Sequence, residues 1–319
     1  MRVAIAMIVT TAFALMTVCI AGCVPLHEHR SVASPPRSEP VLPAAGRPPL
    51  LALVLSGGSA RAFAHIGVIK VLEEAGIEPD IVVGSSAGSL VGVAYGAGMN
   101  AQQLMATARS FDAVALQDFV LPNLGLPLMP GELGFIHGER LQAYVEQLVS
   151  NRPLEALPRR VAVVATDLQT GLPMAFTRGN TGLAVRASAS VPGIFVPPSI
   201  EGRLYVDGQV SSPVPVTVAH RLGARIVIAV DATFPAEQAE ISSTVGVLFQ
   251  SFTIATQRIA GAELTLATLV IRPEIMSRGQ LGLSDREWIM AAGEKAARAQ
   301  LPALLAIRKR IAALGEKVQ

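Results

Sequence analysis

The sequence predicts an α/β fold in which a central, mostly parallel sheet is flanked by helices. Two units of strand, turn and helix near the start of the folded part lead to this prediction. In the first, the apolar run 50–55 is typical of a strand buried on both faces, and apolar residues recur at helical spacing over 63–72. In the second, the apolar run 81–83 is followed, after a turn of small residues, by an apolar helical segment over 90–97. Strands that alternate with helices usually pair in parallel, so this order favours a parallel sheet.

Later segments continue the alternation. Further strands are expected at 160–165, 225–231 and 265–272, with shorter candidates at 174–177 and 203–206. Helical periodicity is seen from about 242 to 263 and again over 285–317, and Gly76 is placed to end the first helix. No internal repeat and no second linker follow residue 50, so residues 50–319 are expected to form one domain.

The segment 81–98 has 18 residues without a charge, which is long enough to be considered as a membrane span. It contains five glycines and three serines, with a turn motif near its start. This composition favours a strand, a sharp turn and a buried helix.

Composition excludes several classes of protein. Hydrophobic residues make up 51% of the 319 residues and charged residues 16%, which excludes a globally disordered chain. The formal net charge is +2, with neither a basic tract nor a zinc-finger spacing, so no nucleic-acid partner is expected. The two cysteines, Cys19 and Cys23, lie near the N-terminus, which excludes a disulfide scaffold and a cysteine-only metal site elsewhere.

Residues 1–22 resemble the signal peptide of a bacterial lipoprotein. A positive residue is followed by the uncharged run 3–21, and Ala and Gly stand directly before Cys23, as in a lipobox. The resemblance implies that Cys23 is acylated and anchors the protein to a membrane of the bacterial cell envelope. Val24 after it is similar to the pattern of outer-membrane sorting. The alternatives are an uncleaved transmembrane anchor and an ordinary secretory signal.

Residues 23–49 are expected to be a lipidated tether. Seven prolines occur between 24 and 49, with no apolar periodicity. At about 3.1 Å per residue in the polyproline II conformation, this segment reaches up to roughly 80 Å.

A G-x-S-x-G motif lies between the second expected strand and its helix, at Gly84-Ser85-Ser86-Ala87-Gly88. Such a motif holds a nucleophilic serine on a sharp turn, and the small residues let the strand and the helix pass closely. The turn also places Ser86 at a helix N-terminus, where the partial positive charge favours a developing anion. The alternative is an inert turn.

A second small-residue turn, Ser-Gly-Gly-Ser-Ala-Arg at 56–61, joins the first strand to the first helix. It lacks the spacing of a dinucleotide-binding loop and the ending of a P-loop. Backbone amides in such a turn can instead bind an oxyanion, and the alternative is an ordinary strand-to-helix turn.

Four segments occur together in one order: 55–68, 84–88, 187–195 and the pair Asp207-Gly208. The combination resembles the patatin-like phospholipase family and spans most of the expected domain. The resemblance implies a patatin-like fold and a catalytic dyad in which Ser86 is the nucleophile and Asp207 the general base. The residues that match the family's oxyanion turn are Gly57, Gly58 and Ser59, with Arg61 as its basic residue. No metal and no organic cofactor is implied.

Three positions depart from the family pattern. Ser59 stands where a third glycine is frequent, and Ala62 where glycine is frequent. Gln209 stands where glycine or alanine usually follows the Asp-Gly pair, and we expect its side chain to narrow the site.

Other assignments stay open from the sequence. His220 is the one histidine that follows Asp207, so it is the candidate for a Ser-Asp-His triad, although a helix histidine without a catalytic role is the simpler interpretation. Asp167 and Asp231 end expected strands and compete with Asp207 as the base. The apolar segment 119–129, which Pro and Gly interrupt, is a candidate to line an acyl channel or touch a bilayer, or is an ordinary buried connection.

The sequence therefore predicts a membrane-tethered serine lipid hydrolase that acts on phospholipids or lysophospholipids. An esterase, thioesterase or acyltransferase with the same dyad is the alternative among enzymes. A catalytically silent lipoprotein that binds lipid or a protein partner is the alternative from another class, and no specific protein partner is predicted.

Overall fold

The computed structural model describes residues 37, 50–112, 118, 133–236, 241, 243–275 and 283–316. The expected signal peptide, Cys23, the tether apart from Arg37, and the segment 119–129 lie outside the described residues. Predictions that concern these segments therefore stay predictions.

The core of the fold is an eight-stranded mixed sheet. Its strands are β1 (Leu51–Leu55), β2 (Ile81–Ser85), β3 (Arg160–Asp167), β4 (Pro173–Phe176), β5 (Ser199–Ile200), β6 (Arg203–Asp207), β7 (Ile226–Val230) and β8 (Leu269–Ile271). The order is β5-β6-β3-β2-β1-β7-β8, with β4 paired to β3. Five adjacent strands run parallel to one another: β3, β2, β1, β7 and β8. The other three, β4, β5 and β6, pair in antiparallel orientation. The predicted fold class, a mostly parallel sheet with helices, is confirmed.

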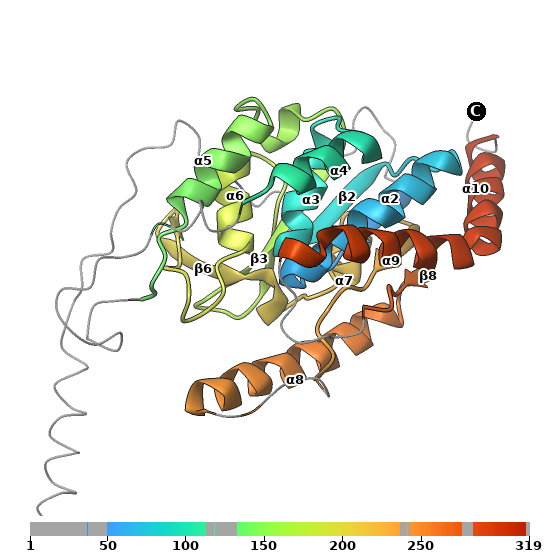
Figure 1. The fold of residues 1–319 in the computed structure, drawn as a ribbon. Coiled ribbons are helices and arrows are strands. Elements are labelled where there is room, and N and C mark those ends of the chain that lie inside the picture. Colours follow the sequence, from blue (N-terminus) through green and yellow to red (C-terminus); the bar gives the residue numbers. More distant parts are fainter. Residues whose placement is uncertain are drawn as a thin grey trace, which may run out of the picture.

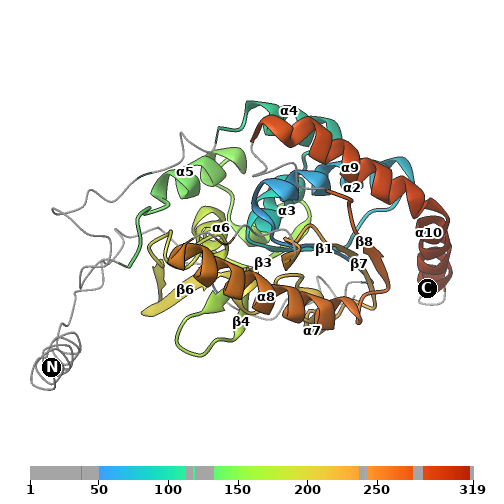
Figure 2. The same cartoon turned by 60° about the horizontal axis from the view of Figure 1, so that its bottom comes forward.

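Helices cover both faces of the sheet (Figures 1 and 2). They are α2 (Ala64–Glu74), α3 (Ala87–Gly96), α4 (Ala101–Ser110), α5 (Glu139–Leu148), α6 (Thr181–Ser188), α7 (Val216–Arg221), α8 (Thr244–Leu264), α9 (Arg286–Ala299) and α10 (Leu301–Glu316). Short 3₁₀ segments are η2 (Ser59–Phe63), η3 (Leu154–Ala156), η4 (Gly208–Val210) and η6 (Leu283–Asp285). Figure 2 shows α2, α3, α4 and α9 on one side of the sheet and α7 and α8 on the other.

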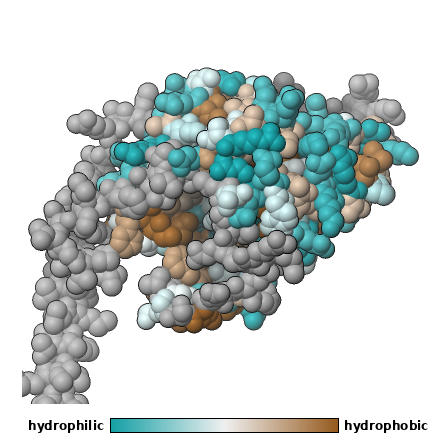
Figure 3. All heavy atoms as spheres, viewed as in Figure 1, coloured by the Kyte–Doolittle hydropathy of each residue, from teal (hydrophilic) through white to brown (hydrophobic). Residues whose placement is uncertain are grey.

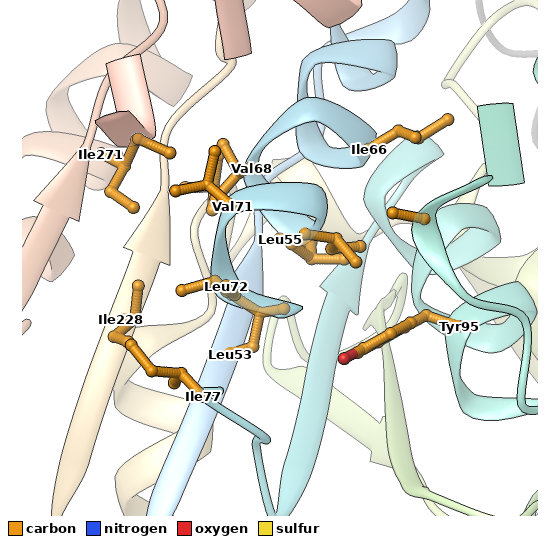
Figure 4. Packing of buried hydrophobic residues seen from close by; sticks show 14 of the residues in the cluster. Leu53, Leu55, Ile66, Val68, Val71, Leu72, Ile77, Tyr95, Ile228 and Ile271 are labelled. Atoms are coloured by element: carbon orange, nitrogen blue, oxygen red, sulfur yellow. The ribbon is translucent and has the colours of Figure 1, made fainter. Parts of the chain in front are cut away.

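The alternation of side chains along β1 explains why this strand is apolar throughout. Leu53 and Leu55 face the helices α2 and α9, where they pack with Val68, Leu72 and Ile228 (Figure 4). Ala52 and Val54 alternate with these leucines and point to the opposite face of the sheet. There they pack in the cluster that α7 and α8 cover. A strand buried on both faces needs apolar residues at every position.

Most expected elements lie where the sequence predicts them, but the last expected strand is shorter. Helix α8 continues to Leu264, and Thr265 caps it with its hydroxyl on the carbonyl of Ala262 at 2.7 Å. The chain leaves the helix in a turn, so β8 begins only at Leu269. The expectation of a strand from 265 was therefore wrong for its first four residues.

The segment 285–317 is two helices where one helical stretch was expected. Helix α9 ends at Ala299 and α10 begins at Leu301. Pro302 has no backbone N–H and its ring is incompatible with the preceding turn of a continuing helix, which explains the break.

Two helices, α4 and α6, were not predicted, whereas α5 begins close to His137, where a helix start was expected. For α4 the signal is in the sequence: the Asn100 side chain accepts from the Gln103 amide, and the Gln103 side chain accepts from the Asn100 amide. This reciprocal pair is a capping box, and it marks the start of the helix. Among the described residues no helix is both long and apolar enough to cross a membrane. The segment 81–98 contains the strand β2 and the helix α3.

Candidate active site

Ser86 lies on a sharp turn between β2 and α3. Its backbone has φ 51° and ψ −130°, a conformation that non-glycine residues rarely adopt. Gly88 lies against the C-terminal end of the neighbouring strand β1, because a Cβ added there would lie 2.4 Å from the carbonyl oxygens of Leu55 and Ser56. The motif therefore needs glycine for the close approach of the helix to β1.

The side chain of Ser86 meets that of Asp207, which is 121 residues away in sequence. The Ser86 hydroxyl donates to Asp207 Oδ2 at 2.6 Å, and Asp207 Oδ1 accepts from the Gln209 amide at 2.8 Å. The sheet explains the meeting, because β3 pairs with β2 along one part and with β6, which ends at Asp207, along another. Both groups are buried, with Ser86 6% and Asp207 0% exposed.

Burial of its carboxyl group raises the pKa of Asp207 to about 6, although hydrogen bonds from Ser86 and Gln209 act in the opposite direction. The group is therefore mostly ionised at neutral pH, yet much more basic than an ordinary aspartate. A buried carboxylate of this kind can accept a proton from a serine hydroxyl directly.

The turn after β1 lies beside Ser86, because β1 and β2 are parallel neighbours in which Leu55 pairs with Gly84. Gly58 has φ 154°, and a Cβ there would lie 2.3 Å from the carbonyl oxygen of Ala232. Ser59, where the family often has glycine, also has a positive φ of 49°. A backbone bent in this way turns consecutive amides outward, as in anion-binding turns.

The three expected oxyanion donors are not equivalent. The Gly57 amide donates to the carbonyl of Pro213 at 3.1 Å. Within the part of the chain that the structure describes, the amides of Gly58 and Ser59 have no acceptor. An amide already bonded to a carbonyl is not available to an oxyanion, so of the three expected donors only the amides of Gly58 and Ser59 stay candidates.

Arg61 holds the turn in place. Its buried guanidinium donates from Nε to the carbonyl of Ala232 at 3.1 Å and from Nη1 to that of Ile275 at 3.0 Å. It also lies 5.5 Å from the ring centre of Phe234. These contacts tie the turn to the segments that follow β7 and β8.

His65 supports the same turn and was not singled out from the sequence. Its ring is fully buried, and Nε2 lies 2.8 Å from the carbonyl oxygen of Ser56. Burial lowers the pKa of His65 to about 4, so the ring is neutral at physiological pH and donates this hydrogen bond from Nε2. The Ser56 hydroxyl in turn accepts from the Ala232 amide at 2.7 Å.

The third segment of the resemblance, 187–195, contacts the backbone of both Ser86 and Asp207. The Ser188 hydroxyl accepts from the Ser86 amide at 2.8 Å and donates to the carbonyl of Val164 at 2.5 Å. The Ser190 carbonyl accepts from the Asp207 amide at 2.8 Å. Ser188 and Ser190 therefore position the two residues, a role that the sequence alone did not reveal.

Gln209 lies against the small-residue turn after β1. Its side chain packs directly on Gly57, because a Cβ on that glycine would lie 2.3 Å from Gln209 Cδ. Any side chain at position 57 would displace the glutamine.

The competing residues are engaged elsewhere. Asp167 accepts from Arg203 at 2.5 Å, and Asp231 accepts from Arg272 at 2.9 Å. The two ring nitrogens of His220 lie 3.0 Å from backbone carbonyl oxygens, and neither contacts Asp207. No group of three or more His, Cys, Asp or Glu residues that could hold a metal ion occurs among the residues described.

Comparison with known proteins gives a consistent result. The model of the family described as patatin-like phospholipase matches residues 53–220, more than half of the chain. An uncharacterized NTE family protein of Mycobacterium tuberculosis is 34% identical over 182 residues, which are 57% of this chain and 49% of that protein. Patatin-like phospholipase domain-containing protein 6 of Mus musculus is 32% identical over 184 residues, 57% of this chain and 13% of that protein.

A second uncharacterized NTE family protein of Mycobacterium tuberculosis is 31% identical over 280 residues, 79% of this chain and 46% of that protein. The chain thus spans about half the length of these mycobacterial relatives. Among solved structures, VipD from Legionella pneumophila matches with a TM-score of 0.49 and 13% identity, over 88% of this chain and 72% of that chain.

Proposed function

The chain belongs to the patatin-like phospholipase family, and on this premise we propose that it is a serine lipid hydrolase that cleaves acyl esters of phospholipids or lysophospholipids. The observation that carries the proposal is the 2.6 Å hydrogen bond from the strained Ser86 to the buried carboxylate of Asp207. Two amides without an acceptor among the described residues lie at the neighbouring strand end.

In the acylation step, Ser86 Oγ attacks the carbonyl carbon of the ester, and its proton passes to Asp207 Oδ2. The negative charge that develops on the carbonyl oxygen is stabilised by the amides of Gly58 and Ser59 and by the N-terminus of α3. When the tetrahedral intermediate collapses, the bond to the alcohol breaks, and the leaving alkoxide takes the proton from Asp207.

In the deacylation step, Asp207 accepts a proton from water, whose oxygen attacks the acyl group on Ser86. The fatty acid leaves as the bond to Ser86 breaks, and the proton on Asp207 returns to the Ser86 oxygen. One carboxylate thus acts as base and then as acid in each half of the cycle, which its pKa near neutrality favours.

Direct proton transfer to a carboxylate requires that water does not compete for it. The complete burial of Asp207, and the hydrogen bonds that hold both of its oxygens, satisfy this condition. A histidine is not needed between the two groups.

We further propose that acylated Cys23 holds the enzyme on a membrane of the bacterial cell envelope. The lipobox-like sequence and the proline-rich tether support this location, which would bring the domain close to lipid substrate. Four apolar residues of α8 are exposed, which favours contact with lipid: Val247, Leu248, Phe249 and Ile254. Figure 3 shows hydrophobic surface at the lower edge of the molecule, where α8 lies in Figure 1.

The activity is tested by treating the full chain with a fluorophosphonate probe and by mass spectrometry of products from defined phospholipids. We expect covalent labelling and fatty-acid release with the natural sequence, and neither with Ser86→Ala. A natural chain that is folded but takes no label and releases no fatty acid would support the silent lipid-binding alternative.

The anchor is tested separately by metabolic labelling with a fatty-acid analogue. The natural chain should incorporate the label and sediment with membranes, whereas Cys23→Ser should do neither. Absence of label in the natural chain would overturn the anchor without affecting the proposed chemistry.

A further inference from the structure

An apolar cavity lies among α2, α3, α4 and α5, with a volume of about 60 Å³. Almost all of its lining is aliphatic or aromatic. The lining residues used below are Phe63, Leu90, Ala94, Ala108, Phe111 and Tyr144. A hollow of this kind excludes polar groups, since it offers them few hydrogen-bond partners.

Three aromatic rings form one wall of the cavity. Phe63 and Phe111 pack edge to face with centroids 6.3 Å apart, and Phe111 packs on Tyr144 in the same way at 5.5 Å. These rings come from η2, from the end of α4 and from α5, so the wall joins three separate segments of the chain. Edge-to-face contacts hold the rings in a defined geometry.

Two segments that adjoin the candidate active site, α3 and η2, contribute residues to the lining of this cavity. Helix α3 begins directly after Ser86, and Leu90, four residues further on, lies on the same face of the helix about 6 Å along its axis. Ala94 follows one turn later. From the other side, η2 begins at Ser59 of the oxyanion turn and ends at Phe63. The two segments that follow Ser86 and the oxyanion turn therefore both contribute to the lining of the cavity.

We propose that this cavity binds the hydrocarbon end of the substrate's acyl chain. An acyl group attached at Ser86 reaches the cavity by following α3 for one to two helical turns. Each methylene group that enters leaves water for an apolar lining, which favours binding. Since a single water needs about 10–15 Å³ measured in this way, the cavity holds only a few carbon atoms and sets an upper limit on the preferred chain length.

This inference rests on the proposed function, because it assumes that Ser86 carries the acyl group. It adds the chain-length selection of the site, which neither the dyad nor the oxyanion turn explains. Helix α4 offers a matched pair of positions for the test: Ala108 lines the cavity, whereas Ala106 on the same helix is exposed.

The test measures kcat/KM of the full chain for p-nitrophenyl esters with acetyl, butyryl, octanoyl and dodecanoyl groups. Ala108→Leu fills part of the cavity, so the ratio of octanoyl to acetyl activity should fall by about ten-fold or more. Ala106→Leu adds the same atoms on the exposed side, and its ratio should stay that of the natural chain.

A second variant changes the cavity in the opposite direction. Phe111→Ala removes one ring of the aromatic wall, so the preferred chain length should increase and dodecanoyl activity should rise relative to butyryl. Opposite shifts in the two variants cannot arise from a general loss of stability, which would lower the activity on all esters together.

Failure of the inference and failure of the proposed function give different results. If the natural chain hydrolyses esters but Ala108→Leu and Phe111→Ala keep its chain-length profile, the cavity is a packing defect and the inference is overturned. If the natural chain hydrolyses no ester and its serine takes no label, the proposed function itself fails.

Discussion

Among the residues that the structure describes there are two buried serine–carboxylate pairs, and only one of them lies in the candidate active site. Ser86 donates to Asp207 at 2.6 Å, and Ser212 donates to Glu263 at 2.7 Å. Burial raises the pKa of Asp207 to about 6 and that of Glu263 to about 7. By hydrogen-bond length and carboxylate basicity alone, the two pairs are nearly indistinguishable.

Their surroundings differ. Ser86 has a strained backbone and stands at the N-terminus of a ten-residue helix, near amides without an acceptor among the described residues. Ser212 is completely buried, and Glu263 also accepts from the Val214 amide at 3.3 Å. This second pair fixes the segment after Asp207, in which the Pro213 carbonyl accepts from Gly57. Catalytic potential therefore comes from access and from oxyanion donors, whereas the hydrogen bond alone gives a structural contact.

The largest expected difference between the pairs appears when each serine is replaced by alanine. Ser86→Ala should lower kcat by at least about 10³-fold, because the nucleophile is lost, with a change of under about 1 kcal/mol in the free energy of unfolding. Ser212→Ala should retain activity but lose about 1–3 kcal/mol of stability, because Glu263 is left without one partner in a buried site. Ester kinetics and urea unfolding of both variants measure the two effects.

Replacing the carboxylates tests the same contrast. Asp207→Asn should reduce activity nearly as much as Ser86→Ala, because an amide oxygen does not take up the serine proton. Glu263→Gln keeps acceptor capacity for Ser212, so its activity should stay within a few-fold of the natural chain.

His220→Ala tests whether a histidine takes part in a catalytic triad. It should leave activity nearly unchanged, since both ring nitrogens of His220 lie beside backbone carbonyl oxygens. An inactive His220→Ala beside an active Asp207→Asn would replace the dyad by a different mechanism.

The oxyanion turn, which the Ser212 pair lacks, is tested by Gly58→Ala. Even one methyl group collides with the carbonyl of Ala232, so the turn must shift and its amides with it. We expect kcat to fall by about 10²-fold, because such donors are worth roughly 3 kcal/mol in the transition state. The KM for a soluble short-chain ester should change much less. Ser59→Gly is the control, since glycine adopts its positive φ without strain. A variant that keeps kcat and only raises KM would mean that the turn positions substrate.

The smallest expected effects are those of pH. The ionisation of Asp207 should appear in the pH dependence of activity, whereas that of Glu263 should appear only in the pH dependence of stability. Asp207 must be ionised to act as base, so kcat/KM should rise as the pH increases through about 6. Glu263, whose ordinary pKa of 4.5 is raised to about 7, binds its proton more tightly in the folded state. Stability should therefore be highest below about pH 4.5 with respect to this group, and fall as the pH rises towards 7.

Glu263→Gln removes that titration, so the pH dependence of stability should become flatter between these values while the activity profile is kept. Thermal unfolding and ester hydrolysis across the pH range measure the two quantities. If Glu263→Gln abolished the rise of activity with pH near pH 6, the roles assigned to the two carboxylates would have to be exchanged.

Local features of the site were open to prediction from the sequence. The apolar runs before residues 56 and 84 indicate buried strands, and the small residues after each run indicate sharp turns. Ser86 follows from its motif, whereas Asp207 follows only from the family resemblance, because an Asp-Gly pair is common in turns. The roles of Ser188 and His65 were missed, since a serine or histidine in an apolar helical segment carries no local signal of its partner.

The sequence by itself determined the order of strands and helices, the glycine-dependent turns and the position of the candidate nucleophile, because each depends on neighbouring residues. Only the tertiary structure decided that Asp207, and not Asp167 or Asp231, contacts Ser86, since that contact requires β6 to pair with β3. It also decided that the Gly57 amide is bonded to the carbonyl of Pro213, which leaves the amides of Gly58 and Ser59 as the candidate oxyanion donors. Hydrogen bonds and pKa values depend on which distant segments exclude water from a group, and local sequence does not record that.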